Sequence, residues 1–380
     1  MTATVPTTTR TAQPRIVHAP AGAAPAGFRP TVAGQVGKPT STYSSLLKSV
    51  REAGLLQRRT GFYVTVFVVL VVCLGGAAAG FVLLGSSWFQ LLIAGALGII
   101  LTQFAFLTHE AAHRQVFESG TRNDKVGRVL AAGVVGISYA WWMTKHSRHH
   151  ANPNTKGKDP DIAFDTISFL EEDAAKQRGV LGFITRRQGY FFFPLLLGEG
   201  VNLHVTSFRT LLGRDKIEGR ALEITLIAVR LVAYFGVVFW FLPVGMAFAF
   251  IGVQMAVFGL YMGSSFAPNH KGMPIIPEGA KVDFLSKQVL TSRNITGRHS
   301  TAFMGGLNYQ IEHHLFPSMA RPNLRAASAL VKAHCAEHGI PYTETTIGKS
   351  YAIVIRYLNR VGLSARDPFD CPAAYALRPR

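Results

Sequence analysis

Four long apolar stretches dominate the hydropathy pattern of the chain, and polar segments separate them into two closely spaced pairs. The stretches cover residues 62–84, 88–107, 221–242 and 244–262. Each is close to the roughly 20 residues that an α-helix needs to cross the hydrocarbon core of a bilayer. The connections within each pair are very short, so the pattern predicts four transmembrane helices in two hairpins. Burial of all four helices inside a soluble protein is the less favoured alternative.

Composition and charge support a membrane protein and argue against a nucleic-acid partner. Hydrophobic residues make up 48% of the chain and charged residues only 16%, yet the net charge is +18. The 39 Lys and Arg residues are dispersed and accompany no nucleic-acid-binding motif, so we expect no nucleic-acid partner. All of them except Arg230 lie outside the apolar stretches. Because cytoplasmic loops of membrane proteins are enriched in Lys and Arg, both termini and the middle segment are expected in the cytoplasm.

The two ends of the chain differ from its middle. Residues 1–40 are rich in Thr, Pro and Ala and lack the features of a signal peptide, so they are predicted to form a disordered tail. Residues 41–345 are assigned to one membrane domain, and residues 346–380 to a cytoplasmic C-terminal tail. The three cysteines fit neither a disulfide framework nor a thiol-ligated zinc site.

Histidines gather in three short segments outside the apolar stretches. They are His109 and His113, then His146, His149 and His150, and finally His313 and His314 after Gln310. Residues three or four positions apart share one face of a helix, so each cluster directs its imidazoles the same way. Imidazole binds iron, copper, zinc and nickel, and seven converging ligands exceed what one zinc ion needs. The clusters therefore predict two metal ions.

All three clusters are expected on the same face of the membrane. His109 comes two residues after the second apolar stretch, and the isolated His270 follows the fourth. Residues 129–143 are also apolar, but at about 15 residues they are too few to cross a bilayer. They are predicted to dip into the interface or to lie along it, because a crossing would separate His146 from His109.

The first cluster taken alone suggests a different chemistry. His109, Glu110 and His113 satisfy H-E-x-x-H, in which two histidines bind zinc and the glutamate is the general base of a metalloprotease. An intramembrane zinc protease is therefore an alternative. It would leave the other two clusters without a role, so the three clusters together favour a two-metal centre.

The three histidine patterns resemble those of the membrane fatty acid desaturase family, H-x3(4)-H, H-x2(3)-H-H and H/Q-x2-H-H. The resemblance extends from about residue 43 to residue 323 and includes the run GGLNYQIEHHLFP at 305–317. That run is similar to the third pattern of front-end and linoleoyl-CoA-type desaturases and their bacterial relatives. The resemblance implies an all-α integral membrane protein with four transmembrane helices, one or two interfacial helices and a cytoplasmic helical cap that holds a di-iron site.

The resemblance also implies a ligand set and a reaction. The positions expected to bind two non-haem iron ions are His109, His113, His146, His149, His150, His270, His313 and His314, with Gln310 standing where other members have a histidine. All of these except His270 and Gln310 are also the catalytic candidates. The implied reaction uses O2 and two electrons to convert adjacent methylenes of an acyl chain, carried by coenzyme A or a lipid, into a cis double bond. A lipid hydroxylase or ketolase shares the same patterns and remains an alternative.

Several polar residues near the clusters have expected supporting roles. The carboxylates expected to orient imidazole N–H groups are Glu110, Glu312, Asp159 and Asp161. His204 and His299 are expected to form hydrogen bonds rather than to bind metal. Surface positions are expected for His18, His334 and His338.

The source of electrons must also be considered. The sequence contains no haem-binding His-Pro-Gly-Gly motif and no glycine-rich flavin or nucleotide fingerprint. Electrons are therefore expected from a separate ferredoxin or NAD(P)H-dependent reductase, which the basic cytoplasmic surface would attract. The expected location is a bacterial plasma membrane, with the active site on its cytoplasmic side.

Overall fold

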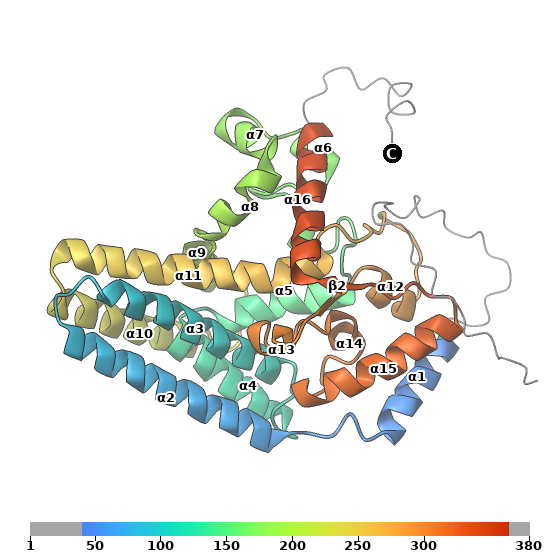
Figure 1. Cartoon of the computed structure of the whole chain (residues 1–380), viewed down its shortest axis with the longest axis horizontal. Helices are drawn as coiled ribbons and strands as arrows, with labels where there is room; N and C mark the ends of the chain where they lie inside the picture. The colour runs from blue at the N-terminus through green and yellow to red at the C-terminus, as the bar shows by residue number, and fades with distance from the viewer. Residues whose placement is uncertain (1–39, 365–380) are drawn as a thin grey trace, which may run out of the picture. The chain divides into compact units, whose positions relative to one another are not determined.

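Long helices dominate the computed structural model, which describes residues 40–364. Four of these helices are long and apolar enough to cross a membrane: α2 (Thr60–Leu84), α3 (Gln90–Ala112), α10 (Arg220–Phe241) and α11 (Val244–His270). They coincide with the four predicted stretches (Figure 1). Helices α3 and α11 continue beyond the predicted ends at residues 107 and 262, so they carry His109 and His270. The predicted tail at 1–40 lies outside the described residues except for Thr40.

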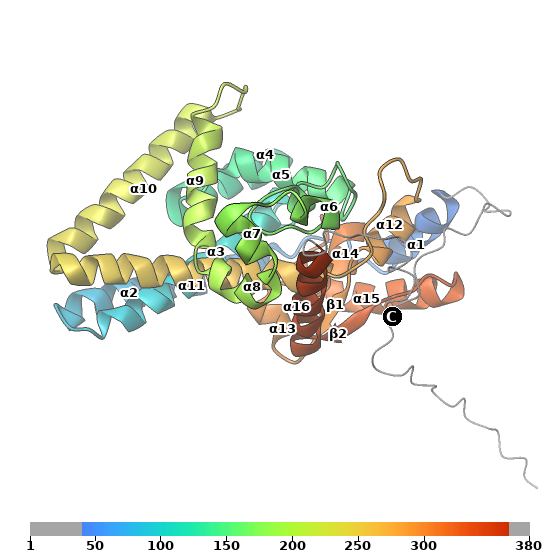
Figure 2. The ribbon, with the colours of Figure 1, turned by 90° about the horizontal axis from the view of Figure 1, so that it is seen from above.

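Helices α3 and α11 form the centre of this bundle. In their most apolar windows 50% and 44% of the residues are buried, against 11% in both α2 and α10. The outer helices therefore present side chains such as Leu83 and Trp240 to the surroundings, as lipid-facing helices do. A Cβ added to Gly98 of α3 would lie 2.9 Å from the carbonyl oxygen of Gln254, so glycine allows α3 and α11 to pack closely. Figure 2 shows α10 and α11 meeting at their connecting turn and diverging from there.

The middle segment doubles back on itself. It consists of α4 (Gly120–Arg128), the π-helical η1 (Val129–Val135) and α5 (Tyr139–Ala151). The chain bends by 116° between the first two elements and α5, which fits a broken span or a re-entrant loop. Gly136 makes the turn with a φ of 92°, a left-handed conformation that favours glycine. Because of this reversal, α5 returns His146 to the end of α3 that carries His109.

A cap of shorter elements lies at the histidine end of the bundle. It contains α1 (Thr40–Glu52), α12 (Phe284–Leu290), α13 (Ser300–Phe303), α14 (Gln310–Leu315) and α15 (Arg321–Glu337). Apolar side chains of α1, α12, α14 and α15 form one buried cluster that includes Leu46, Leu285, Ile311 and Leu324. This cluster fixes the short helix α14, which carries the third histidine pattern.

The cap also contains two strands that the all-α prediction missed. β1 (Asn294–Thr296) pairs in parallel with β2 (Glu344–Thr346), with Ile295 opposite Thr345. Strands of three residues are too short to show a period-two alternation of polar and apolar residues, so no sequence pattern predicted them. The pairing connects the chain after α12 to the chain after α15.

The remaining elements pack beside α11. They are η2 (Pro160–Ile162), α6 (Glu171–Ala174), α7 (Gly179–Thr185), α8 (Gln188–Leu196), α9 (Glu199–Leu211) and α16 (Ile347–Ser364). Helix α16 belongs to the segment that was assigned to a C-terminal tail, but its Val354 and Leu358 are buried against Phe192 and Leu196 of α8. The folded part of the chain therefore continues past residue 345. Residues 365–380 of that tail lie outside the described residues.

Candidate metal centre

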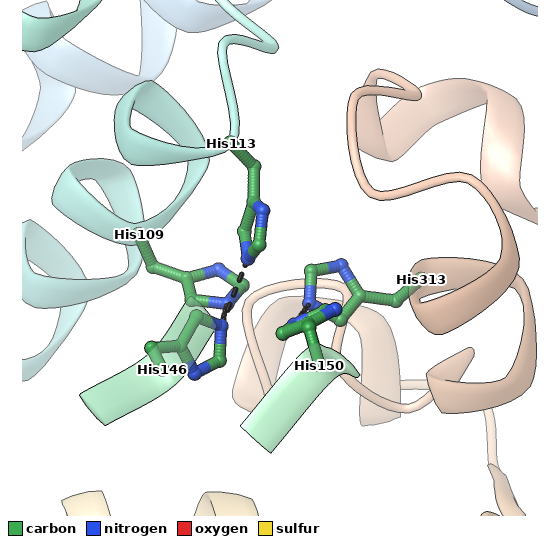
Figure 3. A group of neighbouring side chains, drawn as sticks. All are labelled: His109, His113, His146, His150 and His313. Atoms are coloured by element: carbon green, nitrogen blue, oxygen red, sulfur yellow. Dashed lines mark hydrogen bonds between the residues drawn. The ribbon is translucent and has the colours of Figure 1, made fainter. Parts of the chain in front are cut away.

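Five histidines from three helices converge at the end of the bundle. His109 lies in the last turn of α3 and His113 caps that helix, while His146 and His150 lie one turn apart on α5 and His313 on α14. Their candidate ligand nitrogens all lie within 4.8 Å of one another. Figure 3 shows the rings pointing towards one centre. We call these five residues the first set.

Three further histidines form a second set: His149 of α5, His270 at the end of α11 and His314 of α14. The Nε2 atoms of His149 and His270 lie 3.3 Å apart. The side-chain amide of Gln310 is next to this set, with its nitrogen 2.9 Å from Nε2 of His270. The structure thus brings together all nine residues expected to bind metal, as five histidines in one set and three with Gln310 in the other.

The division between the sets follows from helical geometry. His149 of α5 lies about 100° around the helix from His150, so neighbouring residues point into different sets. His313 and His314 of α14 divide in the same way. The rings of His150 and His314 stack with centroids 4.2 Å apart, so the two sets are direct neighbours. This arrangement is suited to a pair of metal ions.

Distances between the imidazoles fit ligands of one bound metal as well as hydrogen bonds. Nε2 of His146 lies 3.1 Å from Nε2 of His109 and 2.8 Å from that of His113. A metal that holds imidazoles at about 2.1 Å brings neighbouring nitrogens to about 3 Å. Nε2 of the buried His314 has no hydrogen-bond partner among the described residues. Such an unpaired buried nitrogen is costly unless it has a ligand to bind.

Burial keeps most of these imidazoles in the neutral form that metals require. It lowers the pKa of His113 to about 3 and, with help from neighbouring imidazoles, lowers the pKa of His150 and His313 well below 6.5. His149 is the exception. Burial by itself would lower its pKa, but Asp161 and Asp159 outweigh burial and raise it.

The second set is held in place by hydrogen bonds to the Nδ1 atoms. Nδ1 of His149 lies 3.0 Å from Asp159, and Asp161 is 3.5 Å away, as predicted for these two carboxylates. Nδ1 of His270 lies 3.0 Å from the carbonyl oxygen of Thr291. Nδ1 of His314 lies 2.9 Å from Oε1 of Gln288. These contacts leave Nε2 of each ring free for metal.

Gln288 and Thr291 were missed by the sequence analysis. Gln288 lies in α12 (Phe284–Leu290) and Thr291 caps its C-terminal end. This helix carries no histidine and matches no motif. Only the three-dimensional packing of α12 against α14 brings them to the site.

The other two carboxylates are not arranged as expected. Glu110 forms a bidentate ion pair with Arg321, at 2.6 and 2.5 Å. Glu312 accepts hydrogen bonds from Asn294 at 2.7 Å and from Tyr342 at 2.9 Å. Each glutamate adjoins a histidine in a helix and therefore points about 100° away from it, towards the surrounding protein.

The ion pair of Glu110 also bears on the protease alternative. A general base must reach the water that it activates. Both carboxylate oxygens of Glu110 are instead bound by Arg321, and the residue is 2% exposed. The geometry of this pair argues against a zinc protease.

The remaining histidines of the described part of the chain lie outside the two sets. His204 bonds through Nδ1 to the carbonyl oxygen of Gly200 at 2.7 Å, in keeping with its expected role. His299 is the residue before α13. His334 and His338 stack on each other at the end of α15. His18 lies outside the described residues.

Comparisons with known proteins agree with this site. A family model described as fatty acid desaturase matches residues 86–346, which include both sets. Among curated relatives, an acyl-lipid (9-3)-desaturase of Physcomitrium patens is 30% identical over 71% of this chain and 53% of its own length. Delta(8)-fatty-acid desaturase 2 of Arabidopsis thaliana is 28% identical over 86% of this chain and 75% of its own length. A Delta(8)-fatty-acid desaturase of Euglena gracilis is 30% identical over 76% of this chain and 71% of its own.

The coverage and origin of these relatives limit what they imply. The chain spans about half the length of the Physcomitrium relative and about three quarters of the Arabidopsis one. All three relatives are from eukaryotes, so they give no support to the expected bacterial membrane. The family match nevertheless covers more than half of this chain and all three histidine patterns. The chain therefore belongs to the fatty acid desaturase family.

Proposed function

We propose that this protein introduces a cis double bond into a fatty acyl chain, with O2 as co-substrate and two iron ions as cofactor. The observation that carries the proposal is the pair of adjacent, largely buried imidazole sets at one end of an apolar helical bundle. Breaking an unactivated C–H bond needs a redox-active metal, which zinc is not. An all-imidazole pair of sites supports iron, and bound iron would supply the O2 and one-electron chemistry of the reaction.

The protein's own residues have binding and orienting roles in this proposal. The first set would hold one iron through up to five imidazoles, and the second would hold the other through three imidazoles with Gln310 close by. Asp159, Thr291 and Gln288 orient the rings of the second set through their Nδ1 atoms. Burial of His109, His146 and His313 and of the three histidines of the second set limits the access of water and so limits side reactions.

The overall reaction needs partners outside the chain. Two hydrogens leave adjacent methylenes, and O2 is reduced to two water molecules with two further electrons and two protons. A separate ferredoxin or NAD(P)H-dependent reductase would provide the electrons. The acyl chain would arrive as an acyl-CoA or an acyl-lipid from the bilayer, and the site would face the cytoplasm, where the basic residues are concentrated.

Product analysis tests this proposal directly. The chain is expressed in a desaturase-deficient host, and its fatty acids are analysed by gas chromatography and mass spectrometry. We expect a new cis-unsaturated fatty acid with the wild type and with the control variant His338→Ala, and none with His150→Ala. A hydroxylated or keto product would replace the desaturase by the alternative enzyme on the same scaffold. Iron-loaded protein that changes no lipid would contradict both.

A further inference from the structure

The C-terminal end of α15 carries a further group of candidate metal ligands. His334, Glu337 and His338 each offer one ligand atom, and these three atoms lie within 4.8 Å of one another. None of the three residues belongs to the first or the second set. The group is therefore a candidate for a metal site of its own.

The spacing of the three residues places them on one face of the helix. In the run HCAEH at 334–338 they occupy positions i, i+3 and i+4. This order, H-x-x-E-H, reverses the pattern H-E-x-x-H and is likewise one in which two histidines bind zinc. Two histidines and one glutamate are also a ligand combination that zinc has in enzymes. Five-residue patterns recur by chance, so the contacts of the side chains must support the assignment.

These contacts prepare both imidazoles for a ligand. The two rings stack with centroids 4.1 Å apart. Nδ1 of His338 donates a hydrogen bond to the carbonyl oxygen of His334 at 2.9 Å, which leaves Nε2 of His338 for metal. Nε2 of His334 is buried and has no hydrogen-bond partner among the described residues. An unpaired buried nitrogen is costly unless it has a ligand to bind.

The cysteine inside the pattern points elsewhere. Cys335 is fully buried and belongs to the apolar cluster of the cap, together with Ile311 and Leu315 of α14. Because it adjoins His334 in a helix, it points about 100° away from that residue. The candidate ligands are therefore two imidazoles and one carboxylate, without a thiolate.

The three ligands come together only while the end of α15 is helical. His338 is the residue that ends this helix, and its backbone N–H donates to the carbonyl oxygen of His334 at 3.1 Å. An ion bound by all three side chains would stabilise this last turn. It would also stabilise the packing of Cys335 on α14, because metal binding to a site that only the folded chain offers adds to the free energy of folding.

We propose that His334, Glu337 and His338 form a zinc site that is independent of the two sets and stabilises the C-terminal end of α15. Nitrogen and oxygen ligands together suit Zn²⁺, whereas Mg²⁺ prefers oxygen ligands. Glu337 and His338 are exposed, so the ion can enter from solvent and water can complete its coordination. We assign binding and not hydrolysis to the site, because Glu337 lies among the ligand atoms.

Zinc uptake by iron-loaded protein, purified without a histidine tag, tests the proposal. The protein is incubated with Zn²⁺ in the presence of excess Mg²⁺, free metal is removed, and zinc and iron per chain are measured by mass spectrometry. We expect about one additional zinc ion in the wild type, with the iron content unchanged, and none in His334→Ala or His338→Ala. His299→Ala is the matched control, because it removes an exposed histidine elsewhere in the cap, and it should bind as much zinc as the wild type.

A second measurement shows whether the ion stabilises the helix end. Zn²⁺ should raise the melting temperature of the wild type and of His299→Ala but not that of His338→Ala, because a ligand that binds only the folded state stabilises it. Equal stabilisation of His338→Ala and the wild type would place the zinc elsewhere and overturn the proposal.

The metal count has equally definite outcomes. Absence of zinc uptake by the wild type would overturn the proposal, as would equal uptake by the wild type and His338→Ala. Zinc gained with an equal loss of iron would place the ion in the metal centre instead. If His334→Ala does not fold, His338→Ala decides, because its side chain is exposed. The readouts are independent of lipid products, so failure of the desaturase function would leave this test intact.

Discussion

Arg321 binds Glu110 through two hydrogen bonds in a buried ion pair, and the pair joins the first histidine pattern to the helix that follows the third. The backbone N–H of Arg321 also donates to the hydroxyl of Tyr63 at 2.9 Å, and Tyr63 donates to Gln115 at 2.9 Å. Helices α2, α3 and α15 therefore meet at this pair. His109 is next to Glu110 in the sequence, and His313 lies on the helix before Arg321. The ion pair therefore helps to fix the distance between His109 and His313.

Breaking the pair from one side should destabilise the protein and its metal site together. Arg321→Met leaves the carboxylate of Glu110 buried without a cation, which costs about 3–5 kcal/mol. We expect a lower melting temperature and loss of iron, measured by calorimetry and metal analysis. Glu110→Gln combined with Arg321→Met should be less damaging than Arg321→Met alone, because no charge is then left unpaired.

An exposed ion pair provides the control for this experiment. Lys332 and Glu344 lie 2.6 Å apart with half-exposed side chains, so Lys332→Met should lower the free energy of unfolding by only about 0–1 kcal/mol.

A zinc protease would respond differently to the substitutions at the buried pair. Glu110→Gln would then abolish activity with iron or zinc still bound, and Arg321→Met would matter mainly through folding.

Unequal ligand numbers predict unequal responses to histidine removal. His314→Ala leaves two imidazoles in the second set, whereas His113→Ala leaves four in the first. The wild type should hold about two irons per chain, and His314→Ala should lose about one of them. His113→Ala should keep most of its iron at saturating concentrations and lose activity. Iron analysis by mass spectrometry checks both, and equal losses in the two variants would contradict the division into sets.

Sequence spacing predicted the convergence of the histidines but not their partition. The pattern H-x2-H-H places His146, His149 and His150 near one another, yet whether His149 joins the first or the second set depends on where α11 and α14 lie. Those positions follow from packing of distant segments. Local periodicity carries no information about them.

The same limit explains the features that were missed. Arg321 and Glu110 are far apart in the chain, and no local sequence pattern indicates that they form an ion pair. Gln288 acts on His314 only because α12 packs beside α14. The apolar spans were predictable because a length near 20 residues and the absence of charge are themselves local properties.

Glu312 should make stability depend on pH near neutrality. Burial raises its pKa to about 7, against the hydrogen bonds from Asn294 and Tyr342, which lower it. Between its ordinary pKa of 4.5 and about 7, the folded protein therefore binds more protons at Glu312 than the unfolded chain does. The stabilisation from this group is present at low pH and is lost as pH rises towards 7, by about 3 kcal/mol in all.

Replacement by glutamine isolates this contribution. Glu312→Gln is neutral at every pH, so the difference in melting temperature between variant and wild type should change between about pH 4.5 and pH 7. We expect the wild type to lose stability relative to the variant as pH rises. Parallel melting curves over this range would show that Glu312 is ionised in the folded protein.

The position of the site relative to the membrane can be tested by labelling single cysteines. Ser86 is exposed in the turn between α2 and α3, whereas Ser147 and Ser318 are exposed close to the histidines. In a background without native cysteines, Ser86→Cys should react with an impermeant reagent from outside intact cells. Ser147→Cys and Ser318→Cys should react only after permeabilisation, because basic residues concentrate on their side of the spans. The contacts of His109 with His146 and of His150 with His313 require that the three clusters share one side. Outside labelling of Ser147→Cys together with protection of Ser318→Cys would mean that the middle segment crosses the bilayer, and the shared metal centre could not form.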